Sequence, residues 1–447
     1  MKTIVELSQA LTHATLTSEG LAEEVLARAA DPNGEGKRIF IALDAAKVLA
    51  QARASDTLRK AGIVPSPLAG LPVTIKDLFD VAGETTSAGS MVLRDAAPAK
   101  SDAPAIARLR AAGAVLVGRT NLTEFAYSGI GINPHYDTPR NPYDRATGRI
   151  PGGSTSGGAV SVTDGMAVIG LGTDTGGSTR IPAALCGIVG YKPSQARIPT
   201  TGVFPLSTSL DSIGPMGASV ACCAICDAIL AGQTPSAPAP APLAGLRLGV
   251  PQSVVLDELD EHVGRDFGRS LERLSRAGAK LVETPMAPFA EMSDINRPGG
   301  LSPMEAYYVH RPLIERGGDR YDPRVRYRIE GGAKATAYDY LWTLARRRDW
   351  IARVSAEAAR FDAFVMPTVA CIAPPLAPLV NDDDAFRRTN ARVLRNTSLV
   401  NFLDGCALSI PMHAKGSAPT GIMLCGLNGQ DARIFAIGVA VESLLQN

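Results

Sequence analysis

Two short stretches rich in glycine and serine decide how this chain can be interpreted: Pro151-Gly-Gly-Ser-Thr-Ser-Gly-Gly158 and Gly172-Thr-Asp-Thr-Gly-Gly-Ser-Thr-Arg180. Glycine loses more backbone entropy on folding than any other residue, so clusters this dense indicate special backbone angles or close approach to a ligand. A pair of tight turns would use the same residues. The repetition of the pattern around serines, downstream of a buried lysine, favours a catalytic site.

The serines need a base, because a serine hydroxyl is a weak nucleophile until its proton is removed. Neither Ser154 nor Ser178 lies in a Gly-x-Ser-x-Gly elbow, and the phosphate-binding loop and the dinucleotide fingerprint are both missing. Of the five histidines only His135 lies near this region, where we predict a hydrogen-bonding role in a loop. Lys76, which ends a predicted buried strand over 70–76, is the remaining candidate base.

Strands and helices alternate along the chain, a pattern typical of an α/β sheet covered on both faces. The sequence predicts strands at 114–118, 246–251 and 279–282, helices at 103–112 and 261–277, and an ordered loop over 133–158. Residues 301–360 are predicted to be helical and charged, with Arg346, Arg347 and Arg348 on a solvated face. A proline-rich stretch over 232–243 predicts a stiff, extended connection.

The composition argues against several classes of protein. The 447 residues carry 45 Lys and Arg against 44 Asp and Glu, so nothing indicates nucleic-acid or membrane-surface binding. No signal peptide or membrane-spanning stretch is recognisable, which predicts a cytoplasmic protein. The seven cysteines are scattered and are predicted to be reduced thiols.

The motifs resemble those of the amidase signature family over nearly the whole length of the chain. The matching segments are Gly70-Leu-Pro-Val-Thr-Ile-Lys-Asp77, Gly118-Arg-Thr-Asn-Leu-Thr-Glu-Phe-Ala126, Arg140-Asn-Pro-Tyr143, the two glycine–serine stretches, Pro182-Ala183 and, more loosely, Pro411 and Pro419-Thr-Gly-Ile422. In that family a lysine, a serine on a cis peptide and a nucleophilic serine form a triad, with 24 positions between the serines. Ser154 and Ser178 have that spacing. Thr155 departs from the family's usual serine or glycine and leaves Ser156 as an alternative bridging residue.

The resemblance implies a role for each residue of the site. Ser178 is the expected nucleophile, Ser154 the proton relay and Lys76 the base, which burial would keep neutral. The backbone N–H groups of Thr175, Gly176, Gly177 and Ser178 are predicted to form an oxyanion hole. Asp174 and Arg180 are predicted to support this loop. The strip Ala126-Tyr127-Ser128-Gly129 is expected to line the substrate pocket.

The resemblance also implies a single domain over 1–447, built on a large mixed, twisted sheet of about ten strands with helices on both faces. Its expected parts are N-terminal helices over 1–65, a catalytic core over 70–230, and a part over 245–447 that completes the sheet and the pocket. The implied activity is cleavage of a small-molecule amide or ureide through an acyl-Ser178 intermediate. Water is the expected acyl acceptor, no cofactor or metal is expected, and a homodimer is left open as the assembly.

Two alternatives stay open at this point. The glutaminase component of a glutamyl-tRNA amidotransferase, its A subunit, uses the same triad, although the match is weak around residues 300–345. The absence of a neighbouring gene for the B or C component would count against that alternative. A catalytically idle binding module is disfavoured because Lys76, Ser154 and Ser178 are all present.

Overall fold

The computed structural model describes residues 1–446, and its strands form one 11-stranded mixed sheet. The strand order is β1-β3-β2-β4-β6-β5-β10-β11-β9-β7-β8. The strands are β1 Phe40–Leu43, β2 Pro72–Lys76, β3 Val115–Thr120, β4 Ile169–Asp174, β5 Val189–Lys192, β6 Ser212–Gly217, β7 Arg247–Pro251, β8 Lys280–Thr284, β9 Ala363–Pro367, β10 Cys406–Pro411 and β11 Gly421–Gly426. β2 is parallel to both of its neighbours, β3 and β4, whereas the centre of the sheet from β4 to β9 is antiparallel.

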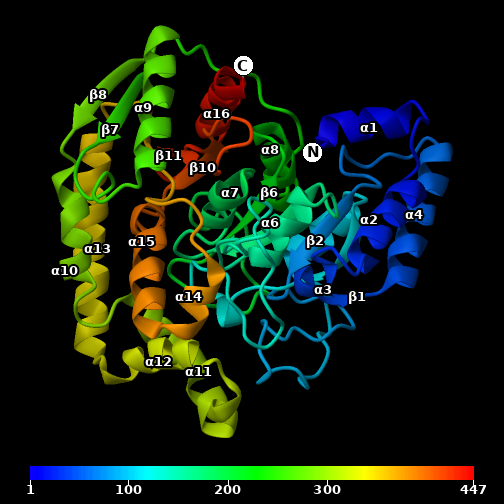
Figure 1. Cartoon of the computed structure of the whole chain (residues 1–447), viewed down its shortest axis with the longest axis horizontal. Coiled ribbons are helices and arrows are strands. Elements are labelled where there is room, and N and C mark those ends of the chain that lie inside the picture. Colours follow the sequence, from blue (N-terminus) through cyan, green and yellow to red (C-terminus); the bar gives the residue numbers. More distant parts are fainter. Residues whose placement is uncertain (447) are drawn as a thin grey trace.

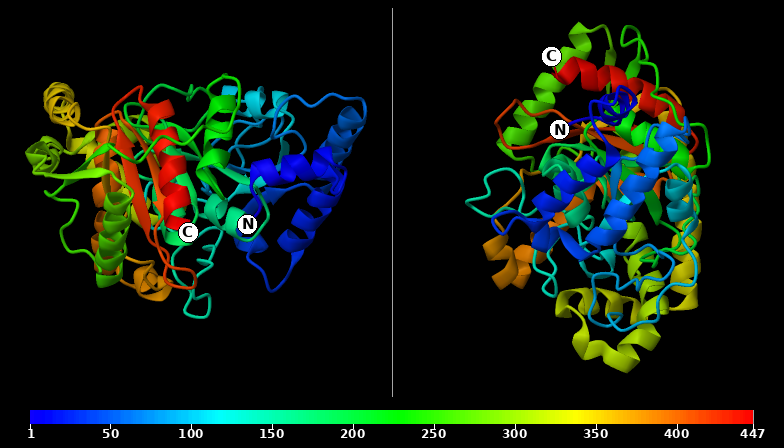
Figure 2. Two further views of the ribbon diagram at one scale, coloured as in Figure 1. Left: turned by 90° about the horizontal axis from the view of Figure 1, so that it is seen from above. Right: turned by 90° about the vertical axis from the view of Figure 1, so that its right-hand side faces the viewer.

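Helices surround this sheet and extend beyond its two ends. The N-terminal helices lie at one end of the molecule, and α9, α10 and α13 lie at the other (Figures 1 and 2). The helices are α1 Ile4–Thr12, α2 Ser18–Ala30, α3 Gly36–Ile39, α4 Ala45–Lys60, α5 Pro104–Ala111, α6 Ser156–Thr163, α7 Arg180–Cys186, α8 Val220–Leu230, α9 Glu261–Arg276, α10 Met292–Ile295, α11 Leu301–Gly317, α12 Pro323–Glu330, α13 Ala337–Ala358, α14 Leu376–Asn381, α15 Asp383–Phe402 and α16 Asp431–Gln446, with short 3-10 turns η1 Glu124–Ala126, η2 Ala287–Glu291, η3 Gly318–Arg320 and η4 Gly331–Lys334.

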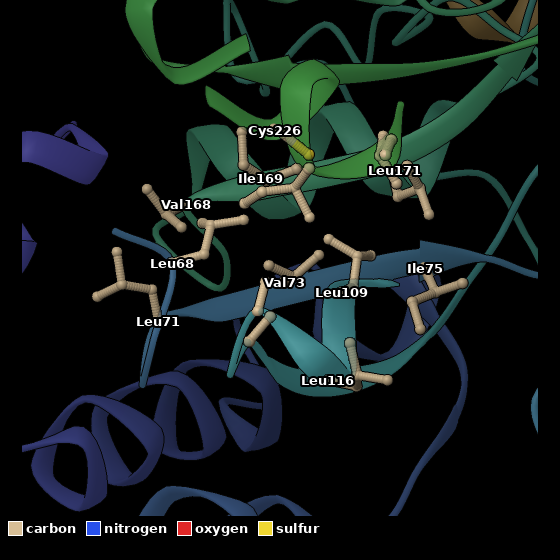
Figure 3. Close-up of a cluster of buried hydrophobic side chains, with 14 of the residues drawn as sticks. Leu68, Leu71, Val73, Ile75, Leu109, Leu116, Val168, Ile169, Leu171 and Cys226 are labelled. Carbon is tan, nitrogen blue, oxygen red and sulfur yellow. The ribbon is translucent and has the colours of Figure 1, made fainter. Parts of the chain in front are cut away.

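The alternation of side chains along β2 places Lys76 on the face opposite to Val73 and Ile75. Val73 and Ile75 point to a face where they pack with residues of β4, α5 and α8 (Figure 3). Side chains alternate across a strand, so Thr74 and Lys76 point to the opposite face. There Thr74 hydrogen-bonds Ser161 of α6 at 2.8 Å. The strand therefore buries its lysine on the α6 side of the sheet.

Along the rest of the sheet, neighbouring side chains of a strand also pack on opposite faces, and helices cover both faces. On β10, Leu408 belongs to the cluster that contains α9 and α16, whereas the adjacent Ala407 packs with α13 and α15. Glycines allow α6 to approach the sheet closely, because a Cβ added to Gly170 would lie 2.5 Å from the carbonyl oxygen of Gly158. The sequence prediction of a mixed sheet covered on both faces is confirmed, with eleven strands instead of about ten.

Most predicted elements agree with the structure within a few residues, and two differences have physical reasons. The predicted loop over 133–158 ends early, because α6 already begins at Ser156. The first glycines of α6 allow close packing against the neighbouring backbone, because a Cβ on Gly157 would lie 2.8 Å from the backbone nitrogen of Asn121. In α13, Arg346 and Arg348 are exposed as predicted, but Arg347 is buried, where it pairs with Asp404 and donates to the Phe402 carbonyl.

The proline-rich segment over 232–243 lies outside the helices and strands, as predicted. β7, β9, β10 and β11, which follow it, join the same sheet as β2–β6. The division into parts over 1–65, 70–230 and 245–447 stays a prediction. Across residues 1–446, no helix combines the length and apolar character needed to cross a membrane. All seven cysteines are buried and unpaired.

Candidate active site

Lys76 lies fully buried at the carboxyl end of β2, and its partners are hydroxyl groups. Its Nζ donates to Ser154 Oγ at 2.7 Å and to Thr173 Oγ1 at 2.9 Å. The neighbouring Asp77 does not pair with it, because the Asp77 carboxylate accepts hydrogen bonds from Arg119 at 2.5 Å and from the Gly89 N–H at 3.1 Å. No carboxylate lies within 4.0 Å of Lys76 Nζ in residues 1–446.

This environment favours the neutral amine. Burial lowers the pKa of Lys76 to about 7, although Asp174 and Asp211 act in the opposite direction at longer range. A lysine with hydroxyl neighbours and no ion-pair partner loses hydration without gaining a compensating charge, and this disfavours its protonated form. Near neutral pH a substantial fraction of Lys76 can therefore accept a proton.

Ser154 contacts Lys76, and Ser156 lies elsewhere. The Gly153–Ser154 peptide bond is cis. Ser156 Oγ lies 3.4 Å from the carbonyl oxygen of Asn121, so its hydroxyl does not point to Lys76. Thr155, the departure from the family motif, fits because its side chain fills space left by glycines: a Cβ on Gly172 would lie 2.7 Å from Thr155 Cγ2.

Ser178 lies in the loop between β4 and α7, at the edge of a cavity, and the residue is 4% exposed. The Ser178 carbonyl accepts a hydrogen bond from the Thr155 N–H at 3.3 Å, which joins the two glycine–serine stretches. The N–H groups of Gly176, Gly177 and Ser178 have no acceptor in the described part of the chain. Free backbone donors beside a serine at a cavity are the arrangement that an oxyanion hole requires. Thr175 also borders the cavity.

Asp174 and Arg180 form a fully buried ion pair beneath this loop, with 2.8 Å between Arg180 Nη2 and Asp174 Oδ1. Asn401 of α15 completes the network, because it accepts from Arg180 at 2.7 Å and donates to Asp174 at 2.9 Å. Burial alone would raise the pKa of Asp174, but the Arg180 guanidinium and the Asn401 amide hold it well below its usual range. Gly177 allows α15 to approach, since its φ is +134° and a Cβ there would collide with the side chain of Thr397.

The cavity beside Ser178, of about 820 Å³, is walled by distant parts of the chain. One side is formed by the strip 126–128 and by the loop 175–178, named the nucleophile loop after the role predicted for Ser178. The other sides come from α10–α12, η4 and α15. Its charged lining residues are Arg328, Glu330 and Lys334, and its apolar ones include Leu206, Leu210, Met292, Leu301, Leu394 and Phe402. The cavity is large enough for a small-molecule substrate.

Only part of the predicted substrate strip 126–129 borders the cavity. Ala126, Tyr127 and Ser128 border the cavity, and Gly129 does not. Phe125 and Ala126 have φ values of 50° and 61°, an unfavourable conformation for residues with a Cβ. Gly129 packs behind the strip, where a Cβ would lie 2.9 Å from Val393 Cγ2.

Three residues of the site were not predicted from the sequence. Thr173 is the second hydroxyl partner of Lys76. Asp211 accepts a hydrogen bond from Thr175, and burial raises the pKa of Asp211 to about 6. Arg328 donates to the Tyr127 carbonyl at 2.8 Å, and its guanidinium lies 4.4 Å from the centre of the Tyr127 ring. Thr173 had a signal, because it lies inside the second glycine–serine stretch; the other two depend on tertiary contacts.

No group of three or more His, Cys, Asp or Glu side chains within residues 1–446 is arranged to hold a metal ion. The side chains gathered around Lys76 and beneath the loop 175–178 are hydroxyls, one amine and a supporting ion pair. These groups can move a proton and stabilise an oxyanion.

The chain is similar to known proteins over nearly its whole length. The family model described as Amidase matches residues 21–435. A 2-amino-5-chloromuconic acid deaminase of Comamonas testosteroni is 37% identical over 90% of this chain and 87% of its own. The A component of the glutamyl-tRNA(Gln) amidotransferase of Chloroflexus aggregans is 33% identical over 98% of this chain and 96% of its own. A crystal structure of an amidase superimposes with a TM-score of 0.89 at 31% identity, covering 99% of this chain and 100% of that one. The chain belongs to the amidase family, and it is a hydrolase that acts on carbon–nitrogen bonds.

Proposed function

We propose that the enzyme hydrolyses a small amide through an acyl-enzyme on Ser178. Neutral Lys76 accepts a proton through Ser154 as Ser178 Oγ attacks the amide carbonyl. The N–H groups of the loop 175–178 stabilise the oxyanion. The proton then returns through Ser154 to the leaving nitrogen, because an amine anion leaves very poorly. Water attacks the acyl-enzyme in the second half of the reaction, giving a carboxylic acid and ammonia or an amine.

The observation that carries this proposal is the position of Lys76. Its buried amine contacts Ser154 and Thr173 at hydrogen-bonding distance and has no ion-pair partner among the described residues. A lysine at the end of a strand that served only stability would be expected to pair with a carboxylate or to reach solvent. A depressed pKa near a candidate nucleophile is typical of a catalytic base.

The cavity supports a substrate that carries a carboxylate. Glu330 is already paired with Arg326 at 2.8 Å, whereas neither Arg328 nor Lys334 has a carboxylate within 4.0 Å in the described residues. The part of the wall formed by α12 and η4 therefore carries unpaired positive charge, and a guanidinium can bind a carboxylate through two parallel hydrogen bonds. The name of the Comamonas relative also gives an acid as the substrate. We assign Arg328 as the contact for a carboxylate near the scissile amide.

The test is ammonia release by the purified chain, without partner proteins, from short amides with and without a carboxylate. Glutamine belongs in the same series, because relatives of about the same length are amidotransferase A components. Hydrolysis of the carboxylate-bearing amides by the chain alone would support the proposed function. Release of ammonia from glutamine only after the B and C components are added would support the amidotransferase alternative instead.

A further inference from the structure

A second cavity, of about 990 Å³, opens beside the one at Ser178. Met292, Asn296, Leu394 and Ser398 line both cavities, so the two are adjacent and share a wall. Together they offer more room than a short amide would fill. The lining of the second cavity also differs in charge from that of the first.

Three arginines of α15 face this second cavity: Arg388, Arg392 and Arg395, which we call the arginine stripe. Their spacing of four and three residues places them on one side of the helix. Ser398 continues the same side and lies 3.3 Å from the carbonyl oxygen of Gly176, in the nucleophile loop. With a rise of about 1.5 Å per residue, the stripe extends from about 5 to about 15 Å from Ser398 along the helix axis.

The arginine stripe has more positive charge than its surroundings neutralise. Arg392 is paired with Asp260 at 2.7 Å. Arg395 donates to neutral acceptors, the Asp257 carbonyl and the Asn396 amide oxygen, and burial lowers its pKa. Arg388 has no ion pair within residues 1–446, and the exposed Glu258 is the only carboxylate among the described residues that line the cavity.

We propose that the arginine stripe is a second anion subsite, which binds a carboxylate at the far end of an elongated amide substrate. This inference rests on the proposed function, because it takes Ser178 as the point of attack. The stripe begins near the loop 175–178, which Ser398 contacts, and continues away from it along the second cavity, which shares four lining residues with the first. A substrate whose amide lies at Ser178 can therefore reach Arg395 or Arg388 with a carboxylate several bonds away.

The experiment uses linear dicarboxylic acid monoamides of increasing chain length, each with its methyl ester as the neutral partner. For the longer chains we expect the wild-type enzyme to prefer the acid. The double variant Arg388→Gln/Arg395→Gln should lower kcat/KM for the long acids by about tenfold, which is the usual scale for a lost charge-assisted hydrogen bond. The kcat/KM values for the methyl esters and for the short acids should not change. Arg387→Gln is the matched control, since Arg387 lies on the same helix, pairs with Asp384 and lines neither cavity.

Binding measured by calorimetry with pimelate, suberate and inorganic phosphate separates this inference from the proposed function. If no amide is hydrolysed and Ser178 is unreactive, the proposed function fails, but loss of suberate binding in the double variant would still support the subsite. Equal kcat/KM values of the wild type for the long-chain monoamide acids and for their methyl esters would overturn the inference. An equal loss of kcat/KM for the long acids in the Arg387→Gln control would also overturn the inference. Phosphate binding as tight as suberate binding would overturn it as well, because it would indicate a general anion site.

Discussion

The reaction centre and the cavity that surrounds it are built in opposite ways. Lys76, Ser154 and Ser178 come from one third of the chain, lie at the ends of strands or in tight loops, and are almost fully buried. The walls that would contact a substrate come mainly from residues 292–402, on helices that carry exposed and partly exposed side chains. The chemistry is therefore fixed by short-range geometry, and the specificity is fixed by how distant helices pack.

The difference has a physical origin. Positioning an amine, two hydroxyls and free N–H groups requires close backbone approach, which only glycine allows at Gly170 and Gly177. A cavity wall requires only a surface of suitable shape and charge, which many side chains can supply. Substitutions in the centre should therefore change the rate of reaction, and substitutions in the wall should change which substrates react.

The largest effect is expected for Ser178→Ala, which should lower kcat by about 10⁴-fold or more, because no other group is placed to form the acyl-enzyme. A fluorophosphonate probe should label Ser178 in the wild type, as located by mass spectrometry. Ser156→Ala is the matched control and should keep most activity, since Ser156 Oγ faces the Asn121 carbonyl. An adduct on Ser154 or Ser156 with Ser178 unmodified would contradict the assignment.

Lys76→Met should lower kcat by about 10³-fold, because the proton from Ser178 loses its acceptor. In the wild type kcat/KM should rise with pH through about 7, where Lys76 loses its proton. The variant should lose this inflection. A rate maximum near pH 5 in the wild type would exclude neutral Lys76 as the base.

Stability should change in the opposite direction, which provides a control for misfolding. The pKa of Lys76 is about 7 in the folded state and about 10.5 when unperturbed, so the unfolded state binds more protons between these values. This group makes the wild type more stable as pH rises from about 7 to about 10, by at most about 1.4 kcal/mol per pH unit. Denaturant unfolding of Lys76→Met should show a higher free energy of unfolding near pH 7 and lack this contribution.

Arg328→Gln tests whether the cavity wall controls substrate binding and not the rate of reaction. It should raise KM for short carboxylate-bearing amides by about tenfold and leave kcat and fluorophosphonate labelling of Ser178 nearly unchanged. Neutral amides of the same size should show no change. Arg348→Gln, on an exposed position of α13, is the control. A fall in kcat with unchanged KM would mean that Arg328 acts on the reaction and not on binding.

The smallest effect on activity is expected for Gly129→Ala. The sequence alone predicts that a bulky residue at Gly129 raises KM, but Gly129 packs against Val393 and does not border the cavity. The added methyl group should lower the free energy of unfolding by about 1–3 kcal/mol and leave KM unchanged. Thermal melts and steady-state kinetics measure the two quantities. A raised KM with normal stability would place Gly129 in the substrate site after all.

The sequence was informative where contacts are local and uninformative where they are distant. The strand ending at Lys76 and the two glycine–serine stretches could be recognised because each is a short local pattern, and their order and the 24-residue spacing of Ser154 and Ser178 match the family motifs. Arg328 could not, because its partner Tyr127 is 201 residues away. The arginine run of α13 shows the same limit: its composition indicates a solvated face, and only the packing of α15 reveals that Arg347 is buried.

The network of Asp174, Arg180 and Asn401 also sets a condition on how the enzyme is made. Arg180 and Asn401 are separated by 221 residues, so the support for the nucleophile loop cannot form until α15 has left the ribosome. At about 5–20 residues per second, this delay is on the order of ten to forty seconds. During synthesis the nascent chain therefore lacks the Asn401 contact to Arg180 until nearly the whole chain has been translated.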